Sequence, residues 1–191
     1  MIDLLEQWDR TLFLKLNSWH SPVGDQIMSF ISGKVEWAPL YLILLVLLIV
    51  KYKRQSWWLL LAVGVAIALS DQISVKVFKE GFERFRPCHN LDLKEIVHLV
   101  NNKCGGKYGF VSSHASNSFS LATLLGLLLQ RKTSKWALIL LWFWAAVVSY
   151  SRIYLGVHYP SDVMGGALLG VLIGGGVYLG VKYTLFMKIK L

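Results

Sequence analysis

Two cations in one short segment of the sequence could bind the oxygens of a phosphate group. Lys79 and Arg86 are seven residues apart, and Pro87 follows directly. Seven residues make two helical turns, so both cations can face one way on a helix, and Pro87 then ends that helix or sets a turn. Arginine offers a planar fork of donors that matches phosphate oxygens, and lysine adds a compact positive charge. The alternative is a basic helix end whose side chains reach toward the membrane surface.

A second segment combines two serines with a histidine immediately before an apolar stretch. Ser112, Ser113 and His114 precede residues 115–129, which we expect to form a helix. The start of a helix has free backbone N–H groups and a positive dipole end, so it binds phosphate readily. Ser112 and Ser113 are therefore candidate phosphate ligands, and His114 is a candidate catalytic residue. Two alternatives stay open, since Ser112 could simply cap the helix and His114 could be an interfacial histidine satisfied by water.

The third segment places an arginine, a histidine and an aspartate in order. Arg152 is another candidate phosphate ligand, and His158 is followed four residues later by Asp162. A carboxylate beside a histidine fixes its tautomer and orientation, as Ser-His-Asp catalysis requires. Asp162 lies close to the start of an apolar run, where a carboxylate is expensive and usually functional if the run spans a membrane. A buried ion pair at a helix end is the alternative interpretation.

Together the three segments contain the groups that phosphoryl transfer without a metal needs. One histidine could attack phosphorus while the other protonates the leaving oxygen, and the cations would balance the phosphate charge. The acidic residues near these segments are scattered, so no two-metal site is expected. Zinc is not expected, because no pair among the nearby histidines has a short ligand spacing: His89, His98, His114 and His158. We therefore expect no metal and no cofactor.

The elements that must position these segments are apolar. Of 191 residues, 55% are hydrophobic and 16% are charged, and the mean hydropathy is +0.51. A soluble domain averages about 25% charged residues, and a disordered chain is poor in apolar and aromatic residues. The composition is that of a membrane protein, so the net charge of +9 does not indicate a nucleic-acid partner. We expect five membrane-spanning helices, and a sixth only if the N-terminal region also spans; the apolar runs lie near 37–50, 57–77, 115–129, 136–148 and 164–181.

Lysine and arginine gather in three segments that contain no acidic residue, 51–56, 131–135 and 182–190. Such segments stay on the cytoplasmic side of a membrane. Their members are Lys51, Lys53, Arg54, Arg131, Lys132, Lys135, Lys182, Lys188 and Lys190. We expect a multi-pass protein of the inner (plasma) membrane with a cytoplasmic C-terminus. The three polar segments would then face the periplasmic, or extracytoplasmic, side.

Residues 1–36 have a different pattern from the rest of the chain. Apolar residues lie near helical spacing among charged ones: Leu4, Leu5, Trp8, Leu12 and Leu16. This pattern predicts an amphipathic helix on the membrane surface. We expect a single membrane-embedded domain over 1–191, with an interfacial segment at 1–36 and a motif-bearing core at 57–180.

The last apolar run contains glycines at intervals of four. Gly166, Gly170 and Gly174 would share one face of a helix. Small residues at this spacing let two helix backbones approach closely, so we expect these glycines to pack against a neighbouring helix.

In order and spacing, the three polar segments resemble the motifs of the type 2 phosphatidic acid phosphatase family, which shares its fold with vanadium haloperoxidases. The family motifs are KxxxxxxRP, PSGH and SRxxxxxHxxxD, and the resemblance covers residues 57–180. The first and third motifs match throughout. In the second, Val111 replaces proline and Ser113 replaces glycine, although Ser113 keeps its backbone N–H. The resemblance implies a lipid phosphate phosphatase built as an all-α bundle of membrane helices.

The resemblance also implies a role for each matched residue. His158 would be the nucleophile that forms a phosphohistidine intermediate, and Asp162 would polarise it. His114 would act first as the general acid and then as the base that activates water. The implied phosphate ligands are Lys79, Arg86, Arg152, Ser112 and the backbone of Ser113. The implied enzyme is a metal-independent phosphatase that vanadate inhibits.

The only two cysteines, Cys88 and Cys104, fall between the first and second motifs. An even pair in an oxidising compartment suggests a disulfide, which would hold the loop beside the site. Two free thiols are the alternative that the sequence leaves open.

The expected reaction is hydrolysis of a phosphomonoester or pyrophosphate of a membrane lipid at the outer face. Undecaprenyl pyrophosphate is the first substrate that we expect, and phosphatidylglycerophosphate, phosphatidate and lipid A are alternatives. A non-catalytic phospholipid-binding or transport protein would explain the cations, but it would not require two histidines and an aspartate together. The expected partners are the lipid substrate and the bilayer, without nucleic acid, and the sequence indicates no oligomeric state.

Overall fold

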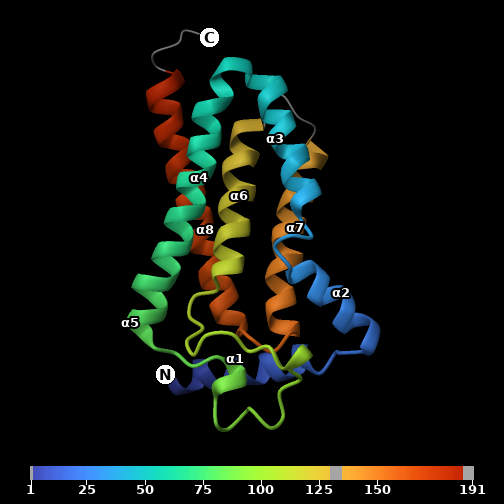
Figure 1. Ribbon diagram of the computed structural model, residues 1–191. Helices are drawn as coiled ribbons and strands as arrows, with labels where there is room; N and C mark the ends of the chain where they lie inside the picture. The colour runs from blue at the N-terminus through green and yellow to red at the C-terminus, as the bar shows by residue number, and fades with distance from the viewer. Residues whose placement is uncertain (1, 130–134, 187–191) are drawn as a thin grey trace.

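Five long helices run side by side along one axis of the computed structural model (Figure 1). The structure describes residues 2–129 and 135–186. The five helices are α3 (Ala38–Tyr52), α4 (Ser56–Gln72), α6 (Ser113–Leu129), α7 (Lys135–Tyr154) and α8 (Pro160–Val181). Within these described ranges there is no strand, only an isolated bridge between Phe85 and Tyr108. The predicted all-α membrane bundle is confirmed.

Three helical stretches of the described chain are long and apolar enough to cross a membrane: Ala38–Phe82, Lys135–Tyr154 and Pro160–Thr184. The first contains both α3 and α4, which fold back on each other through the short turn η1 (Lys53–Gln55) (Figure 1). Most residues of α6 are buried, because the other helices surround it. The chain is therefore a multi-pass membrane protein, while the number of crossings stays a prediction.

The helices α6 and α8 approach each other closely along a stripe of small residues. The glycines of α8 face backbone carbonyl oxygens of α6 and of Ser112 just before it, and an added Cβ atom would collide with those oxygens: Gly166, Gly170 and Gly174. Ser112 N donates a hydrogen bond of 2.9 Å to the carbonyl oxygen of Asp162 at the start of α8. The predicted packing role of the glycines is confirmed, and it brings the second and third sequence motifs together.

The N-terminal residues form two helices outside the bundle axis, α1 (Ile2–Asn17) and α2 (Pro22–Ser32). Figure 1 shows α1 lying across one end of the bundle and α2 beside the lower part of α7. Leu5 and Trp8 are 67% and 73% exposed, whereas Phe13 is fully buried against the ring of Tyr159. The predicted N-terminal helix therefore has an exposed apolar face and an opposite face that docks on the bundle.

The two ends of the bundle carry different connections (Figure 1). The turn η1, the start of α7 and the end of α8 lie at one end, with Lys51, Lys53, Arg54, Lys135 and Lys182. The helix α1 and the loop of residues 83–112 lie at the other end. Four further members of the predicted cytoplasmic group lie outside the described residues: Arg131, Lys132, Lys188 and Lys190.

The predicted helix from Lys79 to Arg86 is wrong. The helix α4 continues through a π-helical segment (Ile73–Lys79) into one short turn, α5 (Glu80–Phe82), and Glu83 then adopts a left-handed conformation with φ 47°. Residues 84–86 are extended, and their backbone pairs with residues 107–109 through hydrogen bonds of 2.8 and 3.2 Å. Pro87 disfavours a helical conformation at Arg86, and the backbone pairing satisfies the groups that a helix would have used.

Candidate active site

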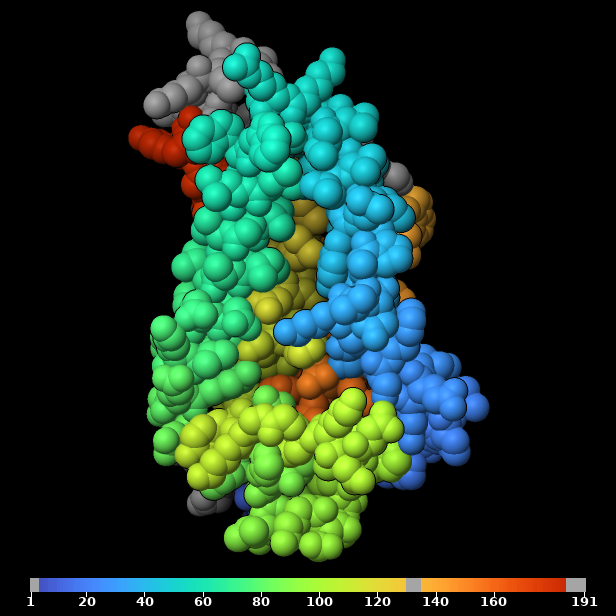
Figure 2. All heavy atoms as spheres, viewed as in Figure 1, coloured from blue at the N-terminus to red at the C-terminus, as the bar shows by residue number. Residues whose placement is uncertain are grey.

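Six of the residues predicted to form the site line one cavity of about 670 Å³: Lys79, Arg86, Ser113, His114, Arg152 and His158. The cavity extends from these polar groups along apolar side chains of α3, α4 and α6, including Leu44, Ile67 and Leu121. Figure 2 shows this face of the molecule hollowed between α3 and α4, with atoms of α6 visible in the hollow. The polar site therefore continues into an apolar space that is open toward the side of the bundle.

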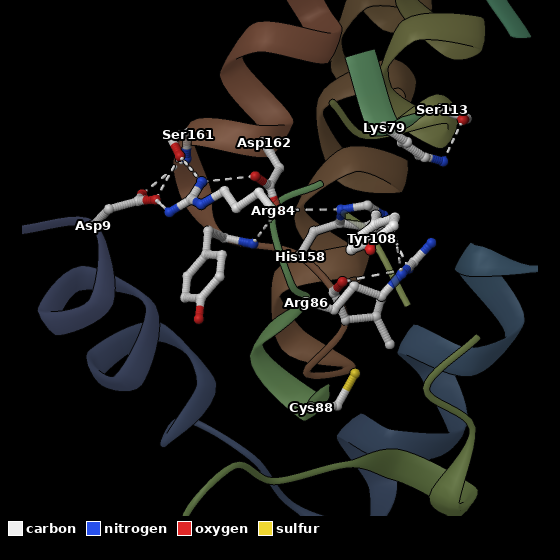
Figure 3. A network of polar contacts seen from close by, with 12 residues as sticks. Asp9, Lys79, Arg84, Arg86, Cys88, Tyr108, Ser113, His158, Ser161 and Asp162 are labelled. Carbon is white, nitrogen blue, oxygen red and sulfur yellow. Dashed lines mark hydrogen bonds and ion pairs between the residues drawn. The ribbon is translucent and has the colours of Figure 1, made fainter. Parts of the chain in front are cut away.

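The loop of residues 155–159 joins α7 to α8 and carries His158 into the site. His158 Nδ1 lies 3.4 Å from Asp162 Oδ2, and both side chains are buried. On the other side of the ring, Arg86 Nη1 lies 3.2 Å from His158 Nε2 (Figure 3). A guanidinium can only donate, so Nε2 must be the accepting nitrogen and Nδ1 must carry the proton. This tautomer directs the lone pair of Nε2 toward the cavity, where it accepts from Arg86.

Electrostatics keep the imidazole of His158 neutral. Burial lowers the pKa of His158 well below its usual value, and the nearby charges of Arg86, Arg152 and Lys79 lower it further. Asp162 does not reverse this effect, although it accepts the contact from Nδ1. A neutral imidazole is the form that can act as a nucleophile at physiological pH.

Three cations of the cavity, those predicted to bind phosphate, are held by neutral partners. Lys79 Nζ donates to Ser113 Oγ at 2.7 Å, and Arg152 Nη1 contacts Ser32 Oγ. Arg86 donates from Nε to the carbonyl oxygen of Tyr108 at 3.2 Å. None of the three cations forms an ion pair within the described parts of the chain. Their positive charge is therefore available to an anionic ligand.

The start of α6 brings two further predicted residues to the site. His114 lines the cavity one residue after the Lys79 partner Ser113. Ser112 is fully buried, and its hydroxyl has no hydrogen-bond partner in the chain as described. The hydroxyl therefore does not cap α6, which removes the capping alternative. Asn117, one turn further along α6, also faces the cavity, and its Oδ1 atom is buried without a partner in the described residues.

The two cysteines lie in the loop that supplies Arg86. Cys88 and Cys104 are joined by a disulfide with a Cα–Cα distance of 5.9 Å. Cys88 is two residues after Arg86, so the bridge ties the arginine-bearing segment to the far side of the same loop. The disulfide therefore restricts the position of the loop that supplies Arg86.

Sequence reasoning missed a second layer of polar residues behind Asp162. Arg84 Nη1 donates to Asp162 Oδ1 at 2.8 Å, and Arg84 Nη2 donates to Asp9 Oδ2 at 2.7 Å (Figure 3). Ser161 completes the group, since its N–H donates to Asp9 Oδ1 at 2.9 Å. Arg84 and Arg86 lie in one extended segment, but only Arg86 lines the cavity, so their spacing alone does not reveal what Arg84 contacts. Asp9 has no local signal either.

Comparison with known proteins identifies the family. A sequence model of the PAP2 superfamily matches residues 55–185. The chain belongs to the PAP2 superfamily. This membership confirms the family and the phosphatase class that the motifs predict.

Several members of the PAP2 superfamily are similar over most of the chain. A lipid A 4'-phosphatase of Bacteroides thetaiotaomicron is 36% identical over 100% of this chain and 84% of its own length. A lipid A 4'-phosphatase of Porphyromonas gingivalis is 36% identical over 92% of this chain and 74% of its own. An undecaprenyl-diphosphatase of Sulfolobus acidocaldarius is 33% identical over 83% of this chain and 71% of its own length. The fold is also that of a PAP2-type phosphatidylglycerolphosphate phosphatase from Bacillus subtilis, whose crystal structure matches with a TM-score of 0.72. The match has 21% sequence identity and covers 95% of this chain and 88% of that one.

Proposed function

We propose that this protein hydrolyses the phosphate group of a membrane lipid through a phosphohistidine on His158. One observation carries the proposal. A buried neutral histidine has its proton held by Asp162, and its other nitrogen faces cations that have no carboxylate partner. A structural His–Asp pair alone would not need the second histidine nitrogen to face cations that lack a carboxylate partner.

The proposed reaction has two steps. His158 Nε2 attacks phosphorus, the P–O bond to the lipid breaks, and His114 gives its proton to the leaving oxygen. Water then attacks the phosphohistidine, His114 takes the water proton, and the N–P bond breaks to release inorganic phosphate. Lys79, Arg86 and Arg152 stabilise the charge on the phosphoryl oxygens in both steps. Asp162 keeps the His158 proton on Nδ1 and balances the positive charge of the phosphorylated ring.

The cavity supports a lipid with a polar head group beyond its phosphate. Its apolar length, which includes Trp37 and Leu48, suits an acyl chain that enters between α3 and α4. Three polar side chains that are not among the predicted phosphate ligands also line it: Lys34, Asp71 and Asn117. Hydroxyl and amide groups of a sugar would satisfy the acceptors among them. We therefore propose a phosphorylated glycolipid, with lipid A as the first candidate, because two similar relatives are named for it.

Undecaprenyl pyrophosphate, the substrate that the sequence suggests first, becomes the second candidate. It has no sugar hydroxyl or amide for Asp71 and Asn117, but the relative from Sulfolobus acidocaldarius is named for it. A non-catalytic phosphate-binding protein becomes a weaker alternative, because the chain belongs to a phosphatase family.

The proposed orientation places the active site outside the cytoplasm. The end of the bundle away from the site carries Lys51, Lys53, Arg54, Lys135 and Lys182, which are typical of a cytoplasmic face. The C-terminus would then be cytoplasmic, and α1 would lie on the outer surface with its exposed apolar face against the lipid head groups.

The test is phosphate release by the purified protein in detergent with EDTA present. The substrates are lipid A, undecaprenyl pyrophosphate, phosphatidylglycerophosphate and phosphatidate. We expect release from lipid A at the highest kcat/KM, and no release by His158→Ala or His114→Ala. His89→Ala is the matched control, because His89 is exposed and lies away from the cavity lining. Full activity of His158→Ala would overturn the mechanism, and a preference for undecaprenyl pyrophosphate would overturn the glycolipid assignment.

A further inference from the structure

Arg84 joins two carboxylates that come from opposite ends of the sequence. Its Nη1 atom lies 2.8 Å from Asp162 Oδ1 and 2.6 Å from Ser161 Oγ, and its Nη2 atom lies 2.7 Å from Asp9 Oδ2. Figure 3 shows the guanidinium between Asp9 of α1 and Asp162 of α8. Arg84 does not line the cavity that contains His158, so it reaches the site only through Asp162.

The two oxygens of Asp162 have separate partners. Oδ2 accepts the backbone N–H of Tyr159 at 2.9 Å and faces His158 Nδ1, whereas Oδ1 faces Arg84. Asp162 is fully buried, and Arg84 is its only arginine or lysine ion-pair partner within the described parts of the chain. A buried carboxylate stays ionised only when it is paired and hydrogen-bonded. The negative charge that holds the His158 proton on Nδ1 therefore depends on Arg84.

Asp9 holds Arg84 from its other side. Asp9 Oδ1 accepts the N–H of Ser161 at 2.9 Å, so the same carboxylate binds both Arg84 and the first turn of α8. The guanidinium also lies over the ring of Tyr159, with 4.3 Å from Cζ to the ring centroid. Burial lowers the pKa of Arg84, but the Asp162 and Asp9 carboxylates raise it overall. The attraction from the two carboxylates thus outweighs the desolvation of the cation.

We infer that Arg84 and Asp9 are positioning residues that set the orientation of Asp162 and the tautomer of His158, and that α1 is consequently part of the active site. The inference rests on the proposed function of His158 as the nucleophile. Asp9 lies outside the residues that match the PAP2 family model, which begin at residue 55. The contribution of α1 is therefore read from this structure and does not follow from the three sequence motifs.

The kinetic test uses the full-length protein and separates positioning from ligand binding. Arg84→Gln should lower kcat by about 10²- to 10⁴-fold, as loss of the correct histidine tautomer does elsewhere, and should leave KM within about twofold. Arg84→Lys should recover part of this loss, because it keeps the charge. Asp9→Asn should lower kcat by about tenfold. Glu6→Gln is the matched control, an acid of the same helix whose one ion pair among the described residues is with Arg10, and it should change neither constant.

A second measurement does not depend on activity. Nitrogen NMR of ¹⁵N-histidine-labelled protein reports which ring nitrogen of His158 carries the proton. We expect the Nδ1–H form in the wild type and a mixture of forms in Arg84→Gln. An unchanged tautomer, or an unchanged kcat per folded molecule in Arg84→Gln and Asp9→Asn, would overturn the inference. If the wild type is inactive on every lipid, but the tautomer of His158 still changes between the wild type and Arg84→Gln, the proposed function alone would be overturned.

Discussion

The two sides of the His158 ring are surrounded in opposite ways. On the Asp162 side, Arg84 lies between two carboxylates at 2.7 and 2.8 Å. On the cavity side, Lys79, Arg86 and Arg152 meet only hydroxyl groups, carbonyl oxygens and the histidine itself. The first arrangement neutralises the charge of Arg84, whereas the second leaves the charges of the cavity cations without a carboxylate. We therefore expect arginine to have a structural role on one side and a role in phosphate binding on the other.

This contrast predicts that replacing Arg84 and replacing a cavity arginine differ most in their effect on the stability of the fold. Arg84→Gln should lower the free energy of unfolding by about 3–5 kcal/mol, because it leaves Asp162 buried without its cation. Unfolding in detergent, followed by circular dichroism, measures the change. Arg10→Gln is the control, since its pairs with Glu6 and Asp92 are more exposed and should contribute less than about 1 kcal/mol. Equal losses in the two variants would remove the contrast.

The loop that carries both Arg84 and Arg86 provides the next prediction. Its disulfide encloses 15 residues between Cys88 and Cys104. Reduction should lower the free energy of unfolding by roughly 3 kcal/mol, because the unfolded chain regains its loop entropy. Alkylation of the unfolded, unreduced protein should add no label by mass spectrometry. Two labels would show that the cysteines are free.

A cavity cation should affect binding more than stability. Arg152→Gln should weaken inhibition by orthovanadate about 10- to 100-fold, because a charged hydrogen bond to the bound anion is lost. The same variant should keep or increase the melting temperature, since no carboxylate loses its partner. A large loss of stability with unchanged vanadate inhibition would place Arg152 in the structural group instead.

The smallest effect concerns the charge of His158. Because burial and the cavity cations lower its pKa, the ring should stay neutral as the pH falls through 6.5, the usual value for histidine. Removing one cation in Arg86→Gln should raise this pKa toward the usual value. An NMR titration of labelled histidine checks both statements. Protonation of His158 at or above pH 6.5 in the wild type would contradict the electrostatic account.

The spacing of the three motifs was enough to predict the cavity side of the site. Lys79, Arg86, Arg152 and His158 are far apart in sequence, but each belongs to a local pattern that the structure brings to one cavity. The helix predicted for residues 79–86 was wrong, because Pro87 and the pairing with residues 107–109 favour an extended backbone. The cations reach the same cavity from a π-helical segment and an extended one.

The Asp162 side could not be predicted in the same way. Asp9 and Ser161 are 152 residues apart, and nothing in the local pattern of residues 1–20 distinguishes Asp9 from the other charges of an amphipathic helix. Its role appears only when α1 docks across the bundle end through Phe13 and Tyr159. Lys34, Asp71 and Asn117 were missed for the same reason, because only the packed helices show that they line one cavity.

The central claim is that His158 Nε2 becomes covalently bound to phosphate during turnover. The most direct measurement is rapid mixing of the protein with ³²P-labelled lipid A, an alkaline quench that preserves phosphohistidine, and mass spectrometry of the digested chain. The account predicts a phosphoryl group on Nε2 of His158, absent from His158→Ala. Phosphate release without a labelled protein, or label on His114 instead, would contradict it.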